Sequence, residues 1–208
     1  MDRVIDYYFV PQSPWTYLGH QRFADLVLRC DCRVRVKPVD LGRVFAVSGG
    51  LPLAQRPTQR QSYRLIDLTR FATHLGMPMN LHPKFFPIAG HAAALRVIAS
   101  AETIDDASAM KLAGAMMRAV WAEDRNIADE ETLDAIASAC GLDASTLRDA
   151  SGGAPVQARY EVNTDEAIAG EVFGAPTYIP RFGPAKDQRF WGQDRLDFLA
   201  SSIEPDRT

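Results

Sequence analysis

A serine at the start of an expected helix is the first residue in this chain with a pattern that suggests chemistry. Ser13 follows a dense run of β-branched and aromatic residues and precedes Pro14, and this pair is typical of a helix N-terminus. Backbone N–H groups and the helix dipole stabilise an anion at such a position, and a hydroxyl adds a hydrogen-bond donor. Ser13 can therefore either hold a thiolate supplied by another molecule or only cap its helix.

Two later segments carry candidate binding residues. Pro176 follows Gly174 and Ala175 and precedes strand-like residues, a placement that resembles the cis-proline turn of thioredoxin folds. The resemblance implies a cis Ala175–Pro176 bond and an exposed Ala175 backbone for pairing with an extended ligand. The alternative is an ordinary trans proline at a strand start. Gln193 and Asp194 open the last expected helix. Asp194 can cap that helix, or it can accept hydrogen bonds from the ammonium group of an amino-acid-like ligand.

The three cysteines, Cys30, Cys32 and Cys140, show no catalytic or metal-binding pattern. An odd number without regular spacing argues against a disulfide framework, and a metal would need two further ligands near Cys30 and Cys32. We therefore expect structural roles for all three cysteines and no metal site.

These candidates must be positioned by the two ends of the chain, both of which have mixed α/β patterns. Residues 4–10 are an apolar run typical of a buried strand, residues 13–29 suit a helix, and residues 33–37 alternate as a half-buried strand does. Near the C-terminus we expect a short helix capped at Asn163-Thr164-Asp165-Glu166, a hairpin around Gly183-Pro184 and a final helix.

The middle of the chain shows helical spacing only. Helices are expected over residues 63–75, 92–101 and 109–120, with a further one after an N-cap at Asp129. Removing this stretch leaves strand–helix–strand followed by helix–strand–strand–helix. The sequence thus predicts an α/β, thioredoxin-like core formed by residues 1–40 and 155–208, with residues 41–154 as an all-helical insertion.

Composition limits the partners. The 208 residues are 47% hydrophobic and carry a net charge of −3, which gives no electrostatic basis for binding nucleic acid or an acidic membrane surface. The N-terminus lacks a signal-peptide pattern, and no apolar stretch reaches the roughly 18 residues that span a bilayer. We expect a cytoplasmic protein without a membrane partner.

In redox-active thioredoxin folds, the first helix begins with two cysteines separated by two residues. The matching segment here is Ser13-Pro14-Trp15-Thr16, so dithiol chemistry is impossible at this position, while the helix terminus that stabilises a thiolate remains.

Seven segments in this order resemble 2-hydroxychromene-2-carboxylate isomerase and the kappa-class glutathione transferases, within the DsbA-like group of thioredoxin folds. The resemblance covers nearly the whole chain. The segments are Ser13-Pro14-Trp15-Thr16-Tyr17-Leu18, Leu41-Gly42 with Phe45, Tyr63 with Asp67-Leu68 and Arg70, Phe86-Pro87, Asn163-Thr164-Asp165-Glu166-Ala167, Val172-Phe173-Gly174-Ala175-Pro176, and Phe190-Trp191-Gly192-Gln193-Asp194-Arg195-Leu196.

The resemblance implies glutathione as the cofactor, a small-molecule substrate (an aromatic carboxylate or another electrophile) and a homodimer. It implies that Ser13 hydrogen-bonds the glutathione sulfur and that Ala175, before Pro176, pairs with the cysteinyl backbone. Gln193 and Asp194 would hold the γ-glutamyl end. Arg60 stands where relatives often have a lysine for the glycyl carboxylate, and arginine can bind a carboxylate bidentately.

Two departures from the family pattern affect the aromatic substrate rather than glutathione. Gly50 occupies a position where relatives commonly have asparagine, and residues 88–91 also lack an asparagine often found there. His91 is the one residue of that stretch able to take a polar role, and a structural role is the alternative.

The leading hypothesis is a glutathione-dependent isomerase of the 2-hydroxychromene-2-carboxylate isomerase type, with a kappa-class-like transferase as a related alternative. A hypothesis of another class is a non-catalytic thioredoxin-fold module that binds a peptide along the Ala175–Pro176 edge.

Overall fold

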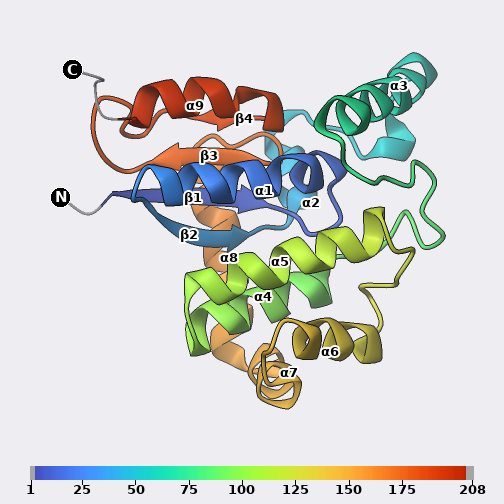
Figure 1. The fold of residues 1–208 in the computed structure, drawn as a ribbon, viewed down its shortest axis with the longest axis vertical. Helices are drawn as coiled ribbons and strands as arrows, with labels where there is room; N and C mark the ends of the chain where they lie inside the picture. Colours follow the sequence, from blue (N-terminus) through green and yellow to red (C-terminus); the bar gives the residue numbers. More distant parts are fainter. Residues whose placement is uncertain (1–2, 205–208) are drawn as a thin grey trace.

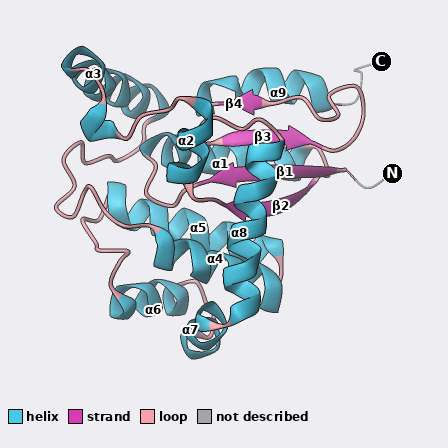
Figure 2. Ribbon diagram, turned by 180° about the vertical axis from the view of Figure 1, so that it is seen from behind, coloured by secondary structure: helices cyan, strands magenta, loops and turns pink. Residues whose placement is uncertain are grey.

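Side chains along the first strand alternate between the two faces of the sheet, and each set packs into a different cluster. The computed structural model describes residues 3–204. In β1 (Val4–Phe9), Ile5, Tyr7 and Phe9 join one core cluster, while Tyr8 joins a second cluster on the opposite face. All five residues from Ile5 to Phe9 are buried, because helices cover both faces of the sheet (Figures 1 and 2).

The remaining elements follow in chain order. They are α1 (Pro14–Arg29), β2 (Arg33–Pro38), α2 (Leu41–Ser48), the 3₁₀ turn η1 (Leu53–Gln55), α3 (Thr58–Leu75), α4 (His91–Thr103), α5 (Asp106–Trp121), α6 (Glu130–Ala139), α7 (Ala144–Gly152), α8 (Ala154–Ala169), β3 (Thr177–Pro180), β4 (Phe190–Trp191), the 3₁₀ turn η2 (Gln193–Arg195) and α9 (Leu196–Ile203).

The four strands lie in the order β2-β1-β3-β4. β1 and β2 are parallel, and α1 connects them. β3 runs antiparallel to β1 with Thr177 opposite Tyr8, and β4 runs antiparallel to β3 with Trp191 opposite Thr177. At one end of the strands, where α1 begins, the last residues of β1 therefore lie beside the start of β3 and the end of β4 (Figure 1).

Two helical layers enclose the sheet. α1 and α9 supply Phe23 and Leu199 to the first cluster, which extends without interruption into α4 and α5 through residues such as Ile98 and Leu112. α2 and α8 supply Val44 and Ala167 to the second cluster. In the part of the chain that the structure describes, no helix is long and apolar enough to cross a membrane.

The strand and helix pattern agrees with most expectations from sequence. Within residues 3–204, every strand lies in the segments assigned to the core, and residues 41–154 contain helices and turns only. The exact division at residues 40 and 155 stays a prediction, because a single hydrophobic cluster crosses it. The homodimer also stays a prediction.

One local expectation was wrong. The segment Asn163-Thr164-Asp165-Glu166 does not begin a helix, because it lies inside α8. Asn163 is buried and its amide donates to the carbonyl of Pro38 at 3.4 Å, so its polarity serves a tertiary contact with the end of β2. Two short helices, α2 and α7, were not expected. Each begins at an aspartate cap, Asp40 or Asp143.

The packing of α1 against η2 yields a stability prediction. A Cβ added at Gly19 would lie 2.6 Å from Gln193 Cβ and 3.1 Å from the Tyr178 hydroxyl. Gly19→Ala should therefore lower the free energy of unfolding by about 1–3 kcal/mol. Gly152→Ala is the matched control, since an added Cβ there meets nothing within 4 Å. Urea unfolding of both variants is the test, and equal stabilities would contradict the close packing.

Candidate active site

Ser13 is the N-cap residue of α1, as the sequence predicts. Its Oγ accepts a hydrogen bond from the Thr16 N–H at 3.2 Å, and the residue is 8% exposed. Pro14 occupies the first turn and has no N–H, while the Tyr17 N–H donates to the Ser13 carbonyl at 3.1 Å. The Ser13 hydroxyl hydrogen therefore remains available to donate to an anion placed beyond the helix terminus.

The Ala175–Pro176 peptide bond is cis, which confirms the sequence expectation. The β1–β3 pairing ends at Tyr8 and Thr177, directly after Pro176, and Ala175 packs against the cluster that contains Val10. The carbonyl of Val10 accepts from the Ser13 N–H at 3.1 Å, which closes the turn into α1. The strand register thus brings Ala175 and Pro176 to the turn that carries Ser13.

Gln193 and Asp194 reach the same end of the sheet from the other side. The N–H of Gly192 donates to the Pro176 carbonyl at 2.9 Å, so the segment after β4 is fixed to the cis-proline turn. Gln193 is 1% exposed and packs against Gly19, whereas Asp194 is exposed and pairs with Arg195 at 2.5 Å. Of these two side chains, only that of Asp194 is open to a ligand.

Arg60 and His91 belong to the helices α3 and α4 rather than to the turns that carry this group. Arg60 is exposed on the first turn of α3. α3 approaches the Ser13 region through Phe71, whose ring contacts the Trp15 ring edge-on with 6.0 Å between centroids. His91 is exposed, and its ring packs against the Tyr160 ring of α8 with 5.0 Å between centroids, as a structural role would require.

Packing explains why position 50 has no side chain. A Cβ there would lie 2.2 Å from the ring of Phe45 in α2, so no side chain fits while that ring keeps its place. The Arg56 guanidinium lies over the same ring, 5.9 Å from its centroid. The Phe45 ring and the Arg56 guanidinium therefore lie beside the position where the family pattern has an asparagine.

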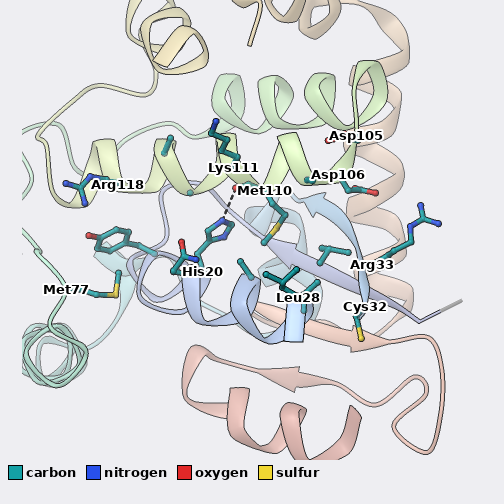
Figure 3. Close-up of a pocket in the computed structure, with 18 of the residues that line it drawn as sticks. His20, Leu28, Cys32, Arg33, Met77, Asp105, Asp106, Met110, Lys111 and Arg118 are labelled. Carbon is teal, nitrogen blue, oxygen red and sulfur yellow. Dashed lines mark hydrogen bonds between the residues drawn. The ribbon is translucent and has the colours of Figure 1, made fainter. Parts of the chain in front are cut away.

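A groove of about 950 Å³ runs between α1 and α5 (Figure 3). Its walls include Leu28, Met77 and Met110, and none of the six predicted site residues lines it. At its floor His20 is buried, with Nε2 2.9 Å from the Met110 carbonyl and Nδ1 3.1 Å from the Tyr7 hydroxyl. Because a carbonyl only accepts, Nε2 carries the hydrogen and Tyr7 donates to Nδ1.

Sequence reasoning missed a cluster of Arg64, Phe86 and Trp121. The Arg64 guanidinium lies 5.4 Å from the Phe86 ring centroid and 5.7 Å from that of Trp121. The Phe86–Pro87 bond is also cis. The Phe-Pro dipeptide was a signal of a special turn, but nothing in the sequence linked it to Arg64.

Known proteins share this architecture. The model of the DsbA-like thioredoxin domain matches residues 4–204. 2-Hydroxychromene-2-carboxylate isomerase of Sphingobium xenophagum is 30% identical over 204 residues, covering 98% of this chain and 99% of that protein. Glutathione S-transferase kappa 1 of Caenorhabditis elegans is 24% identical, covering 98% of this chain and 94% of that protein. A solved structure of 2-hydroxychromene-2-carboxylate isomerase has a TM-score of 0.73 at 28% identity, covering 96% of this chain and 94% of that one. The thioredoxin-like fold expected from sequence is confirmed.

The buried His20 predicts a pH dependence of stability. Burial lowers the pKa of His20 to about 4, against its ordinary value of 6.5. Between these two values the unfolded chain binds the proton and the folded chain does not, so stability is full above pH 6.5 and falls as the pH drops towards 4. The loss reaches about 3 kcal/mol.

Urea unfolding between pH 7 and pH 4 measures this loss. His20→Gln should flatten the pH dependence relative to wild type, whereas His74→Gln, at an exposed position of α3, should leave it unchanged. An identical pH profile for wild type and His20→Gln would contradict the assignment.

Proposed function

The chain belongs to the family of DsbA-like thioredoxin domains that includes 2-hydroxychromene-2-carboxylate isomerase and the kappa-class glutathione transferases, and from this premise we propose that it is a glutathione-dependent isomerase of the 2-hydroxychromene-2-carboxylate isomerase type. Its named relatives are enzymes with isomerase or glutathione transferase activity. The observation that carries the proposal is the capping Ser13 of α1, held next to a cis proline where redox relatives need cysteine.

The residues present suit a bound thiolate. Ser13 offers a hydroxyl donor, and α1 is a 16-residue helix whose N-terminus favours negative charge. Of the three cysteines, none lies at this helix start, since Cys30 and Cys32 follow α1 and Cys140 follows α6. A nucleophilic sulfur must therefore come from a ligand.

When bound, glutathione would supply a sulfur that adds reversibly to a conjugated carbon of the substrate, so that the ring can open and a carbon–carbon bond can rotate before the sulfur leaves. Ser13 would hold the sulfur in its charged form. The Ala175 backbone would pair with the cysteinyl part, and Asp194 would accept from the γ-glutamyl ammonium. Gln193 would act through its backbone N–H, because its side chain is buried. Arg60 would attract the glycyl carboxylate.

Calorimetry with glutathione tests this proposal against a peptide-binding module. Glutathione should bind more tightly than an unrelated tripeptide of equal charge, and equal affinities would favour the module. Incubation with glutathione and a 2-hydroxychromene-2-carboxylate should isomerise the substrate and return all the glutathione. A stable glutathione conjugate would instead indicate a transferase.

The role of Ser13 gives a spectroscopic prediction. A free thiol has a pKa of about 8.5, and a hydrogen bond to a charged acceptor contributes about 1.5–3 kcal/mol, or roughly one to two pKa units. The N-terminus of α1 adds roughly 0.3–2 kcal/mol and desolvation opposes both effects, so we expect a net fall of about one to two units on binding. Ser13→Ala should raise the bound pKa by about one unit while most glutathione affinity remains. The ultraviolet band of the thiolate, titrated with pH, is the measurement.

Loss of a helix cap needs its own control. Asp143→Ala removes the cap of α7, where Asp143 accepts from the Thr146 N–H at 3.0 Å, and should cost about 1 kcal/mol of stability as Ser13→Ala does. Asp143→Ala should not change the pH midpoint at which the thiol of bound glutathione titrates. The same midpoint in wild type and Ser13→Ala would reduce Ser13 to a cap.

The γ-glutamyl contact is tested at Asp194. Asp194→Asn removes the charge that would pair with the ammonium group and should weaken glutathione binding about tenfold or more. Binding of cysteinylglycine, which lacks the γ-glutamyl group, should not change. Asp197→Asn, on the exposed side of α9, is the matched control. Equal weakening for both ligands would argue against this contact.

A further inference from the structure

Arg64 is an arginine without an acidic partner in a half-buried position. Within residues 3–204, its only recorded contacts are with the faces of Phe86 and Trp121, and its Nη2 atom is buried without a hydrogen-bond partner. Burial, and to a smaller degree the charge of Arg56, lowers the pKa of Arg64 to about 10. Leaving a buried donor unpaired costs about 1–3 kcal/mol, and more for a charged group.

Another buried arginine of this protein, Arg96, does have acidic partners. Arg96 is 1% exposed and forms ion pairs with Glu130 and with Asp134, the latter at 3.0 Å. It also donates to the Ala144 carbonyl at 3.2 Å. Packing alone therefore does not explain why Arg64 has no acceptor, since acidic partners accompany the buried arginine of α4.

Further cations without acidic partners lie beside Arg64. Among the residues that the structure describes, neither Arg56 nor Arg60 forms an ion pair, and Arg56 donates only to the Leu51 carbonyl at 2.8 Å. Burial and the charge of Arg60 lower the pKa of Arg56. Three unneutralised cations close together favour an anionic ligand.

Aromatic side chains define the shape of this site. The rings of Phe86 and Trp121 lie 4.9 Å apart between centroids, and the guanidinium lies over both. Trp121 Nε1 is a second buried donor without a partner in the described chain. Phe86 is only partly buried, so its remaining surface can contact a planar ligand whose charged end reaches the guanidinium.

The cluster is joined to the Ser13 site by two connections. Arg64 and Phe71 lie on one face of α3, seven residues or about 10 Å apart, and Phe71 contacts Trp15 in the first turn of α1. The loop after Phe86 leads to Gly90, which packs closely against the side chain of Gln12. α3 lies beside the N-terminal end of α1 (Figure 1).

We propose that Arg64, held over the rings of Phe86 and Trp121, binds the carboxylate of a planar aromatic acid, which is the substrate that meets the sulfur at Ser13. The role as substrate site rests on the proposed function, whereas carboxylate binding at Arg64 does not. The site is distinct from the glutathione contacts at Ala175, Gln193 and Asp194, whereas Arg60, one turn before Arg64 on α3, is the residue that adjoins both sites. Arg64 would thus select among electrophiles by charge, and Phe86 by shape.

The test uses coumarin-3-carboxylate as a stable planar probe and neutral coumarin as its uncharged counterpart. Calorimetry on the full chain at constant ionic strength should show coumarin-3-carboxylate binding at least tenfold more tightly than coumarin. Arg64→Gln should lower its affinity about 10- to 100-fold, the range for hydrogen bonds to a charged group. Arg64→Lys, which keeps the charge but not the bidentate geometry, should fall between.

Arg70→Gln is the matched control on the same helix, because Arg70 is exposed and pairs weakly with Asp67 at 3.5 Å. It should bind the probe as wild type does. Unchanged probe affinity in both Arg64 variants would overturn the proposal. So would equal competition by inorganic phosphate, since that would indicate a site for any anion.

Glutathione affinity, measured separately in each variant, distinguishes the two proposals. Unchanged glutathione binding with lost probe binding in Arg64→Gln supports separate sites. Loss of glutathione binding alone would assign Arg64 to the glycyl carboxylate and overturn the substrate role. Arg64-dependent probe binding in a protein that does not bind glutathione would support the carboxylate site and overturn the proposed function.

Discussion

The antiparallel pairing of β3 with β1 is the constraint on which the candidate active site depends. It fixes Thr177 opposite Tyr8, so the cis-proline turn can lie only beside the Val10–Ser13 turn. The bond from the Gly192 N–H to the Pro176 carbonyl then attaches η2 to the same place. Three segments that are far apart in sequence are thus held by backbone hydrogen bonds, which do not depend on the side chains that do the chemistry.

Some of the buried polar atoms that lack a partner in the described chain lie at this constrained end of the molecule. Buried side-chain atoms without a partner among residues 3–204 include Gln12 Oε1, Thr16 Oγ1 and the Gln193 amide, all near the start of α1 or packed against it. By contrast Asp6, within β1, is paired with Arg35 at 2.6 Å and Arg181 at 2.7 Å. Native proteins seldom leave buried polar groups unsatisfied, so this distribution is expected of a surface that receives a ligand.

The sequence predicted the parts that local chemistry determines. The apolar run of β1, the Ser13 cap and the Asp129 cap all depend on neighbours in the chain, and each was found where expected. The cis Ala175–Pro176 bond was expected from the resemblance of its segment to the cis-proline turn of thioredoxin folds. Asn163 was misjudged because its partner, the Pro38 carbonyl, is distant in sequence.

Tertiary contacts account for the other differences. The burial of Gln193 follows from a glycine at position 19 in α1, which no local pattern reveals. The cluster around Arg64 likewise joins α3, a loop and the end of α5, so its parts share no sequence motif. Because only tertiary packing of the helices brings these residues together, the sequence could not predict that they are neighbours.

This separation has a consequence for how the fold can vary. Most residues proposed for glutathione lie at the start of α1 and in the segments flanking β3 and β4, with Arg60 of α3 as the exception, whereas Phe45, Arg56, Arg64 and Phe86 belong to helices and loops between β2 and α4. Gly50 is one such position, because a Cβ there would meet the Phe45 ring, over which the Arg56 guanidinium lies. A glycine where the family pattern has asparagine removes an amide from this wall without altering the register of β1 and β3. If sulfur activation resides at the start of α1 and substrate choice in the helical wall, then substitutions in that wall should change which electrophile is accepted while the chemistry at Ser13 is preserved.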